Sequence, residues 1–139
     1  MPDFLLDTNV LAEFMKHDPA APAIVFLADR NQCWTSTIVR YELEHGINRL
    51  PQGHRCDTLK MQTDFLLDLF KNRILPIGEK EASMASRLMA QAERSGRNPE
   101  LADILIAGTA VANNLTLATR NVKDFENLGI SLVNPWDTG

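Results

Sequence analysis

Five short apolar segments alternate with longer stretches of helical character along the whole chain. The apolar segments cover residues 4–6, 33–37, 74–77, 115–118 and 130–133. The stretches predicted to be helical cover residues 9–16, 19–29, 38–50, 57–71, 79–94 and 99–114. Short apolar strands that alternate with helices are typical of a parallel sheet covered on both faces. The pattern therefore predicts an α/β fold, with all of residues 1–139 in a single domain.

Two helix starts follow from the residues that precede or open them. Thr8 is suited to cap the helix at 9–16, because threonine oxygens accept hydrogen bonds from first-turn amides. Pro99 is suited to open the helix at 99–114, because proline is favoured at the first helical position.

The composition is that of an ordinary globular protein, with 45% hydrophobic and 23% charged residues. No apolar run approaches the roughly 18 residues that a membrane-spanning helix needs, and the N-terminus lacks a signal-peptide pattern. We therefore expect a cytoplasmic protein with no membrane partner. Cys33 and Cys56 are too few for a disulfide framework or a zinc site. The net charge of −4 argues against a surface built for bulk nucleic-acid binding.

Asp7 and Asp124 each follow a predicted strand. Asp7 comes directly after residues 4–6 in "DFLLDTNVLAEF", and Asp124 lies just past residues 115–118 in "TRNVKDF". Ligands of open parallel sheets bind outside the carboxyl ends of the strands, so both acids are candidate site residues. Taken alone, Asp7 is equally compatible with a turn or cap, and Asp124 is better explained as an N-terminal residue of a short helix.

Asp103 heads the apolar stripe of its predicted helix. The positions that share its face are Ile106, Ala107, Ala110 and Val111. Complementing the helix dipole would explain the position of this carboxylate along the helix, but not the direction that it faces. Because acids are seldom buried unpaired, Asp103 is the strongest single site candidate.

Glu42 shares a helix face with Ile38 and Gly46, and alone it is more typical of a solvated helix residue. Gly46 is unusual there, because glycine costs about 1 kcal/mol relative to alanine inside a helix. One use for it is to leave room beside Glu42 for a ligand or a second chain.

Together, the acids of these separate elements can meet at one edge of the sheet, with Glu42 reaching in from its helix. Gathered carboxylates repel one another, so some must bind a proton or a cation. Ligation by oxygen alone suits Mg²⁺ or Mn²⁺ rather than zinc or copper. The chemistry expected of such a site is attack of metal-activated water on a phosphodiester, with one or two metal ions left open.

At these residues the chain resembles the PIN-domain family, in its VapC-like toxin ribonuclease group. The shared motifs are "LLDTN", "STIVRYELEHG", "ADILIAGTA" and "LATRNVKDF", in the order and at the spacing of the family across essentially the whole chain. The closing "NPW" is similar to the FitB-like branch. The resemblance implies a single-domain α/β/α sandwich with a central parallel sheet. It also implies a metal-dependent endoribonuclease, the toxin of a type II toxin–antitoxin pair.

The resemblance also implies roles for individual residues. It assigns Asp7, Glu42, Asp103 and Asp124 to a catalytic acidic cluster, with Asp7 and Asp103 as the direct ligands of Mg²⁺ or Mn²⁺. The polar positions that support such a cluster are matched by Thr8, Asn9, Thr119 and Asn121. The chain departs from the family at Gly108, where an alanine is common.

The partners implied by the resemblance are an RNA substrate, a second copy of the chain in a homodimer and a VapB-like antitoxin whose tail lies over the active site. Operator DNA would be bound only through the complex with the antitoxin. A second interpretation is a catalytically silent, regulatory PIN protein that acts with its antitoxin on operator DNA. The intact acidic set favours catalysis, because a pure binding module has no need of clustered acids facing phosphate.

Two surfaces are further candidates for contacts with partners. A basic rim that steers RNA is predicted from Arg40, Arg49, Arg120 and Lys123, which are otherwise solvated surface charges. The apolar residues of the first two predicted helices exceed what one face needs, which suggests a dimer or antitoxin groove if they are not core. They are Leu11, Phe14, Met15, Val25, Phe26 and Leu27.

Overall fold

A five-stranded sheet forms the centre of the computed structural model, which describes residues 3–16, 18–20, 22 and 32–137. Its strands stand in the order β3-β2-β1-β4-β5, and every neighbouring pair is parallel. Their bounds are Phe4–Leu6 (β1), Cys33–Ser36 (β2), Ile74–Leu75 (β3), Thr116–Ala118 (β4) and Leu132–Val133 (β5). All five predicted strands and their parallel arrangement are therefore confirmed, each with slightly shorter or equal bounds.

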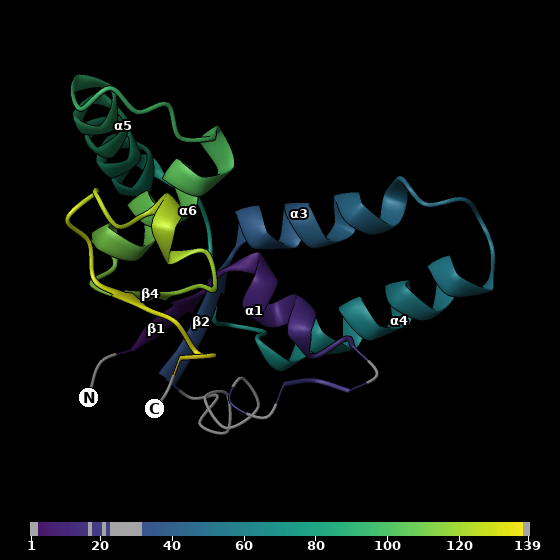
Figure 1. The fold of residues 1–139 in the computed structure, drawn as a ribbon. Coiled ribbons are helices and arrows are strands. Elements are labelled where there is room, and N and C mark those ends of the chain that lie inside the picture. Colours follow the sequence, from purple (N-terminus) through teal and green to yellow (C-terminus); the bar gives the residue numbers. More distant parts are fainter. Residues whose placement is uncertain (1–2, 17, 21, 23–31, 138–139) are drawn as a thin grey trace.

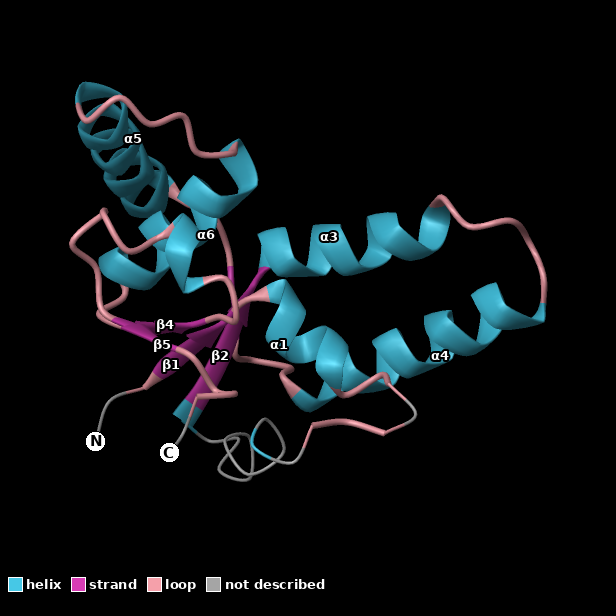
Figure 2. Cartoon of the chain, viewed as in Figure 1, coloured by secondary structure: helices cyan, strands magenta, loops and turns pink. Residues whose placement is uncertain are grey.

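Helices flank this sheet, which confirms the α/β class with a central parallel sheet. Their bounds are Thr8–Glu13 (α1), Thr37–Asn48 (α3), His54–Leu69 (α4), Glu79–Arg94 (α5) and Leu101–Ala112 (α6), with a 3-10 turn at Val122–Asp124 (η2). Figure 1 shows α5 and α6 together on one side, and α1 beside the long hairpin formed by α3 and α4. Figure 2 shows the strands converging between these two groups. The helix predicted over residues 19–29 lies largely outside the described residues.

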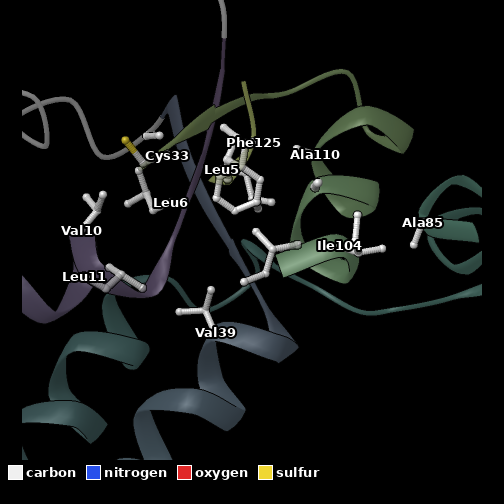
Figure 3. Close-up of a cluster of buried hydrophobic side chains, with 14 of the residues drawn as sticks. Leu5, Leu6, Val10, Leu11, Cys33, Val39, Ala85, Ile104, Ala110 and Phe125 are labelled. Atoms are coloured by element: carbon white, nitrogen blue, oxygen red, sulfur yellow. The ribbon is translucent and has the colours of Figure 1, made fainter. Parts of the chain in front are cut away.

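The hydrophobic core lies between the central strands and these helices (Figure 3). Leu5 and Leu6 of β1 are fully buried, and they contribute to one cluster with Ile104 of α6 and Phe125. Leu11 belongs to the same core, and Phe14 and Met15 pack against it. Leu11 is therefore a core residue, which was the alternative to a partner groove, whereas Phe14 and Met15 keep part of their surface exposed and their role in a groove stays a prediction. Val25, Phe26 and Leu27 lie outside the described residues.

Two helix starts differ from their predictions. The N-cap of α1 is Asp7, whose carboxylate accepts the Thr8 amide; Thr8 is already the first residue of the helix, and its hydroxyl donates to Glu42. Helix α6 begins at Leu101 rather than at Pro99. Glu100 is extended (φ −70°, ψ 147°), and its carbonyl accepts the amide of Ile104, so the helical turn starts only after it.

Two helical glycines stand in opposite surroundings. A Cβ on Gly108 of α6 would lie 2.7 Å from the backbone nitrogen of Ala85 in α5, so the two helices approach at this point as only glycine permits. A Cβ on Gly46 of α3 would meet nothing within 4 Å. The space beside Gly46 is thus open, and its use by a ligand or second chain stays a prediction.

None of the described helices is both long and apolar enough to cross a membrane.

Candidate active site

The four predicted acids lie close enough to influence one another electrostatically. Asp7 caps α1 at the end of β1, Glu42 lies on α3, Asp103 in the first turn of α6 and Asp124 in η2 after β4. The negative charges of Asp7, Asp124 and Glu42 all act on Asp103. The structure therefore brings together the four residues, although 117 positions separate the first from the last in the sequence (124 minus 7).

Asp7 is buried and held on both carboxylate oxygens. Its Oδ1 accepts the backbone amide of Thr8 at 2.8 Å, and its Oδ2 accepts the hydroxyl of Thr119 at 2.8 Å. The amide group of Asn9 also donates to Oδ2, at 3.4 Å. These hydrogen bonds fix the orientation of a carboxylate that is only 5% exposed.

The hydroxyl of Thr119 connects the segment at residues 7–9 with the turn that follows β4. Besides donating to Asp7, its Oγ1 accepts the side-chain amide of Asn9 at 3.3 Å and the backbone N–H of Asn121 at 3.1 Å. Asn9 in turn accepts the backbone N–H of Arg120 at 3.1 Å. Asn121 thus reaches the cluster through its backbone rather than through the side chain that the family pattern marks.

Thr8 fixes the position of Glu42. Its hydroxyl donates to Oε1 of Glu42 at 2.5 Å, which ties α3 to the start of α1. Glu42 therefore turns toward the cluster instead of extending into solvent, and the solvated-surface interpretation of this residue is wrong.

The burial and charge of the cluster raise the pKa of two of its carboxyl groups. Burial is the main cause of the raised pKa of Asp7, to which the charges of Glu42 and Asp124 add, while hydrogen bonds from Thr119 and Thr8 oppose it. Burial also raises the pKa of Asp103 to about 6, with the charges of Asp7, Asp124, Glu42 and Glu100 adding to the shift. A site that makes its own carboxylates costly to ionise favours a bound proton or cation.

The donor set of this site fits a hard divalent cation. Over the part of the chain that the structure describes, no three His, Cys, Asp or Glu side chains are already arranged to hold one metal ion. Mg²⁺ does not require such a cage, because it commonly keeps several waters and binds through one or two carboxylates plus substrate phosphates. Asp7 and Asp103 meet that requirement with oxygen donors alone. Their raised pKa values show that their negative charges are unfavourable in this site, and a bound cation would offset those charges.

Basic residues stand around the acids, though not all of those predicted do so. Arg40 pairs with Glu44 along α3 at 3.5 Å, as a solvated surface charge. The Arg120 guanidinium lies 5.0 Å from the ring centre of the half-buried Trp136. Lys123 lines a cavity together with Asp103 and Asp124, and so does Arg97, which sequence reasoning missed. The signal available for Arg97 was its place in "SGRNP", directly before the helix that carries Asp103.

Replacing Asp103 with asparagine is expected to raise the thermal stability of the metal-free protein at neutral pH. Because the pKa of Asp103 is about 6 in the folded protein and 3.8 ordinarily, the folded state binds more protons between these values. Its free energy of unfolding therefore falls as the pH rises through that window. Asparagine removes this loss, so we expect a gain of about 1–2 kcal/mol at pH 7 after solvent screening, or roughly 3–6 °C in Tm.

Thermal unfolding in EDTA across a series of pH values measures this effect. The difference in Tm between variant and wild type should be small near pH 4, should grow as the pH rises from about 4 to about 6, and should level off above that. A difference that stays constant over the series would show that the carboxyl of Asp103 titrates normally.

Comparison with known proteins finds the family of the chain and the same fold in solved structures. Residues 4–130 match the PIN domain. The chain is 35% identical to the plasmid stability protein StbB of Pseudomonas syringae pv. tomato, over 96% of this chain and 98% of the relative. It is 32% identical to VapC ribonuclease Y4jK of Sinorhizobium fredii, with 96% and 97% covered. Toxin FitB of Neisseria gonorrhoeae is also 32% identical, with 95% and 97% covered.

Among solved structures, the chain is similar to one described as FitAB bound to an IR36 DNA fragment. The TM-score is 0.90 at 29% identity, and the match covers 98% of this chain and 97% of the other. The likeness extends over every element that carries an acid of the cluster.

Proposed function

The chain belongs to the PIN-domain family, and from that premise we propose that it is a metal-dependent endoribonuclease, the toxin of a toxin–antitoxin pair. The observation that carries the proposal is the acidic cluster: four carboxylates from separate segments, two of them with a raised pKa. A relative named as a VapC ribonuclease and one named as toxin FitB, each 32% identical over nearly the full length, support it.

The proposed cofactor is Mg²⁺ or Mn²⁺, held by Asp7 and Asp103. When bound, such an ion acts as a Lewis acid that lowers the pKa of water and offsets charge at the phosphate. Thr8, Asn9 and Thr119 hold Asp7 in one orientation, so this ligand is in place before substrate arrives.

Glu42 and Asp124 are then the carboxylates that remain for proton transfer. In phosphodiester hydrolysis the oxygen of water bonds to phosphorus, the bond from phosphorus to one sugar oxygen breaks, and that oxygen receives a proton. A carboxylate near the phosphate assists by accepting the proton that the attacking water loses. Glu42 is suited to this step because Thr8 fixes its position through Oε1.

The proposed partners are an RNA substrate, a second copy of the chain and a VapB-like antitoxin. DNA enters only through the antitoxin, and the structure of FitAB on a DNA fragment is consistent with that arrangement in a relative. The same structure keeps a second candidate open, a catalytically silent protein that acts with its antitoxin on operator DNA. A binding protein of that kind would have no need of the cluster, and this is why we favour the nuclease.

Removal of divalent metal is expected to abolish cleavage of RNA. The purified, antitoxin-free protein is incubated with a labelled RNA mixture that includes structured, tRNA-sized species, with Mg²⁺ or Mn²⁺ or with EDTA. Discrete cuts should appear with metal, and their rate should fall on the order of 10³-fold in EDTA, because several kcal/mol of charge stabilisation are lost.

Circular dichroism of the same samples serves as the control for folding. If the folded protein with metal leaves every RNA intact, the nuclease proposal is wrong and operator DNA becomes the next ligand to test. Cuts of equal rate in EDTA would instead overturn the metal dependence alone.

A further inference from the structure

A cavity of about 390 Å³ opens directly beside the acidic cluster. Asp103 of α6 and Asp124 of η2 contribute to its wall, so the cavity and the cluster share two side chains. The remaining wall comes from the segment between α5 and α6 and from the residues after η2. In Figure 1 the short yellow turn of η2 lies against the green ribbon of α6, where these segments meet.

The residues that line this cavity carry charges of both signs. Asp103 and Asp124 of the cluster and Glu100 before α6 supply negative charge, whereas Arg97 and Lys123 supply positive charge from two different segments. The apolar surface comes from Pro99, which is half-buried, and Leu128, which is 5% exposed. A ligand that suits the cavity therefore combines a negative group with a less polar body, and it lies next to the acids of the cluster.

Arg97 is held in place both by its backbone N–H and by its guanidinium. Its backbone N–H donates to the carbonyl of Ala92 at 2.9 Å, after Gly96 in the left-handed region (φ +77°) ends α5. With the amide of Asn127 turned so that its oxygen faces the guanidinium, Arg97 donates hydrogen bonds to Asn127, which follows η2 in the chain. A guanidinium has five N–H donors in a planar fork, so it can bind a neutral amide oxygen and still offer donors to a phosphate.

We propose that this cavity binds the nucleotide next to the scissile phosphate, with Arg97 and Lys123 holding the phosphate of that nucleotide. Pro99 and Leu128 contact its ribose or base. This inference rests on the proposed function. It assigns residues to the phosphate of the neighbouring nucleotide, which the acidic cluster itself does not attract. Four acids repel a polyanion, so fixed cations beside them are needed to hold the strand while the cluster acts on one bond.

Arg97→Ala is expected to weaken binding of a labelled single-stranded oligoribonucleotide about tenfold. Binding is measured by fluorescence anisotropy in EDTA, so that cleavage does not interfere. The slope of log affinity against log salt should fall by about 0.7, which is the change for one lost phosphate contact to a single strand. Lys123→Gln should act in the same direction, and Arg97→Lys should restore part of the affinity.

Arg87→Ala is the matched control, because Arg87 is also exposed and lies on α5 but does not line the cavity. Oligonucleotides shortened by one nucleotide at a time from each end provide the second test. The Arg97→Ala penalty should vanish once the nucleotide that occupies the cavity has been removed.

Equal affinities and salt slopes for Arg97→Ala and Arg87→Ala would overturn the cavity proposal, and metal-dependent cleavage by both would leave the nuclease proposal intact. The cavity proposal would also be overturned if the wild-type protein bound no RNA. Conversely, Arg97-dependent RNA binding without any cleavage would uphold the cavity and overturn the nuclease. The two proposals therefore fail in distinguishable ways.

Discussion

Asp103→Asn is expected to lower the rate of metal-dependent RNA cleavage on the order of 10³-fold without unfolding the protein. Asparagine keeps the shape of the side chain but removes the charge that the proposed cation requires. The same substitution relieves the repulsion from Asp7, Asp124 and Glu42, so the variant should be at least as stable as the wild type. Single-turnover cleavage of an RNA that the wild type cuts, with Mg²⁺ in excess, measures the loss.

Asp57→Asn is the control for this substitution. Asp57 is also an acid in the first turn of a helix, α4, but it is exposed and outside the cluster. Its replacement should change the rate by no more than about twofold. Equal losses in the two variants would mean that Asp103 serves only its helix dipole, and the active-site assignment would not survive.

Gly108→Ala is expected to destabilise the protein by about 2 kcal/mol. The added Cβ would lie 2.7 Å from the nitrogen and 2.8 Å from the Cα of Ala85, both backbone atoms of α5. Because backbone cannot rotate away as a side chain can, α5 and α6 must separate. That cost exceeds the roughly 1 kcal/mol that alanine gains over glycine inside a helix. Equilibrium unfolding in urea measures the difference.

Gly46→Ala is the matched control on α3, where the added Cβ would meet nothing within 4 Å. Here only the helix propensity changes, so the variant should gain about 0.5–1 kcal/mol. The two substitutions are chemically identical and should differ in sign. A gain at both positions would show that α5 and α6 accommodate a methyl group at their contact.

The sheet could be predicted from sequence because its strands are short, apolar and separated by helices. Phe4–Leu6 was predicted with the bounds that the structure shows, as was α5 at Glu79–Arg94. The starts of helices were harder to predict from the sequence, because they depend on contacts made across the fold. Thr8 is a residue type that often caps helices, but here α1 begins at Thr8 itself with Asp7 as its cap, and the Thr8 hydroxyl donates to Glu42, 34 positions away.

The site was predictable in its acids and less so in its cations. Asp7, Asp103 and Asp124 stand next to element boundaries, where a sequence pattern marks them. Arg97 comes to line the cavity beside the acids only when the α5–α6 segment folds next to η2, and no local spacing in the sequence encodes that arrangement.

The hydroxyl of Thr119 carries a consequence for the order in which the chain is made. Asp7 is synthesised before its partner on Oδ2, which follows it by 112 residues, and Asp124 comes later still. The strands β1 and β4 that bring them together are neighbours in the sheet, although 112 positions separate the paired residues Phe4 and Thr116 (116 minus 4). A growing chain therefore has no assembled cluster until residue 124 has been made and the β4 segment has paired with β1.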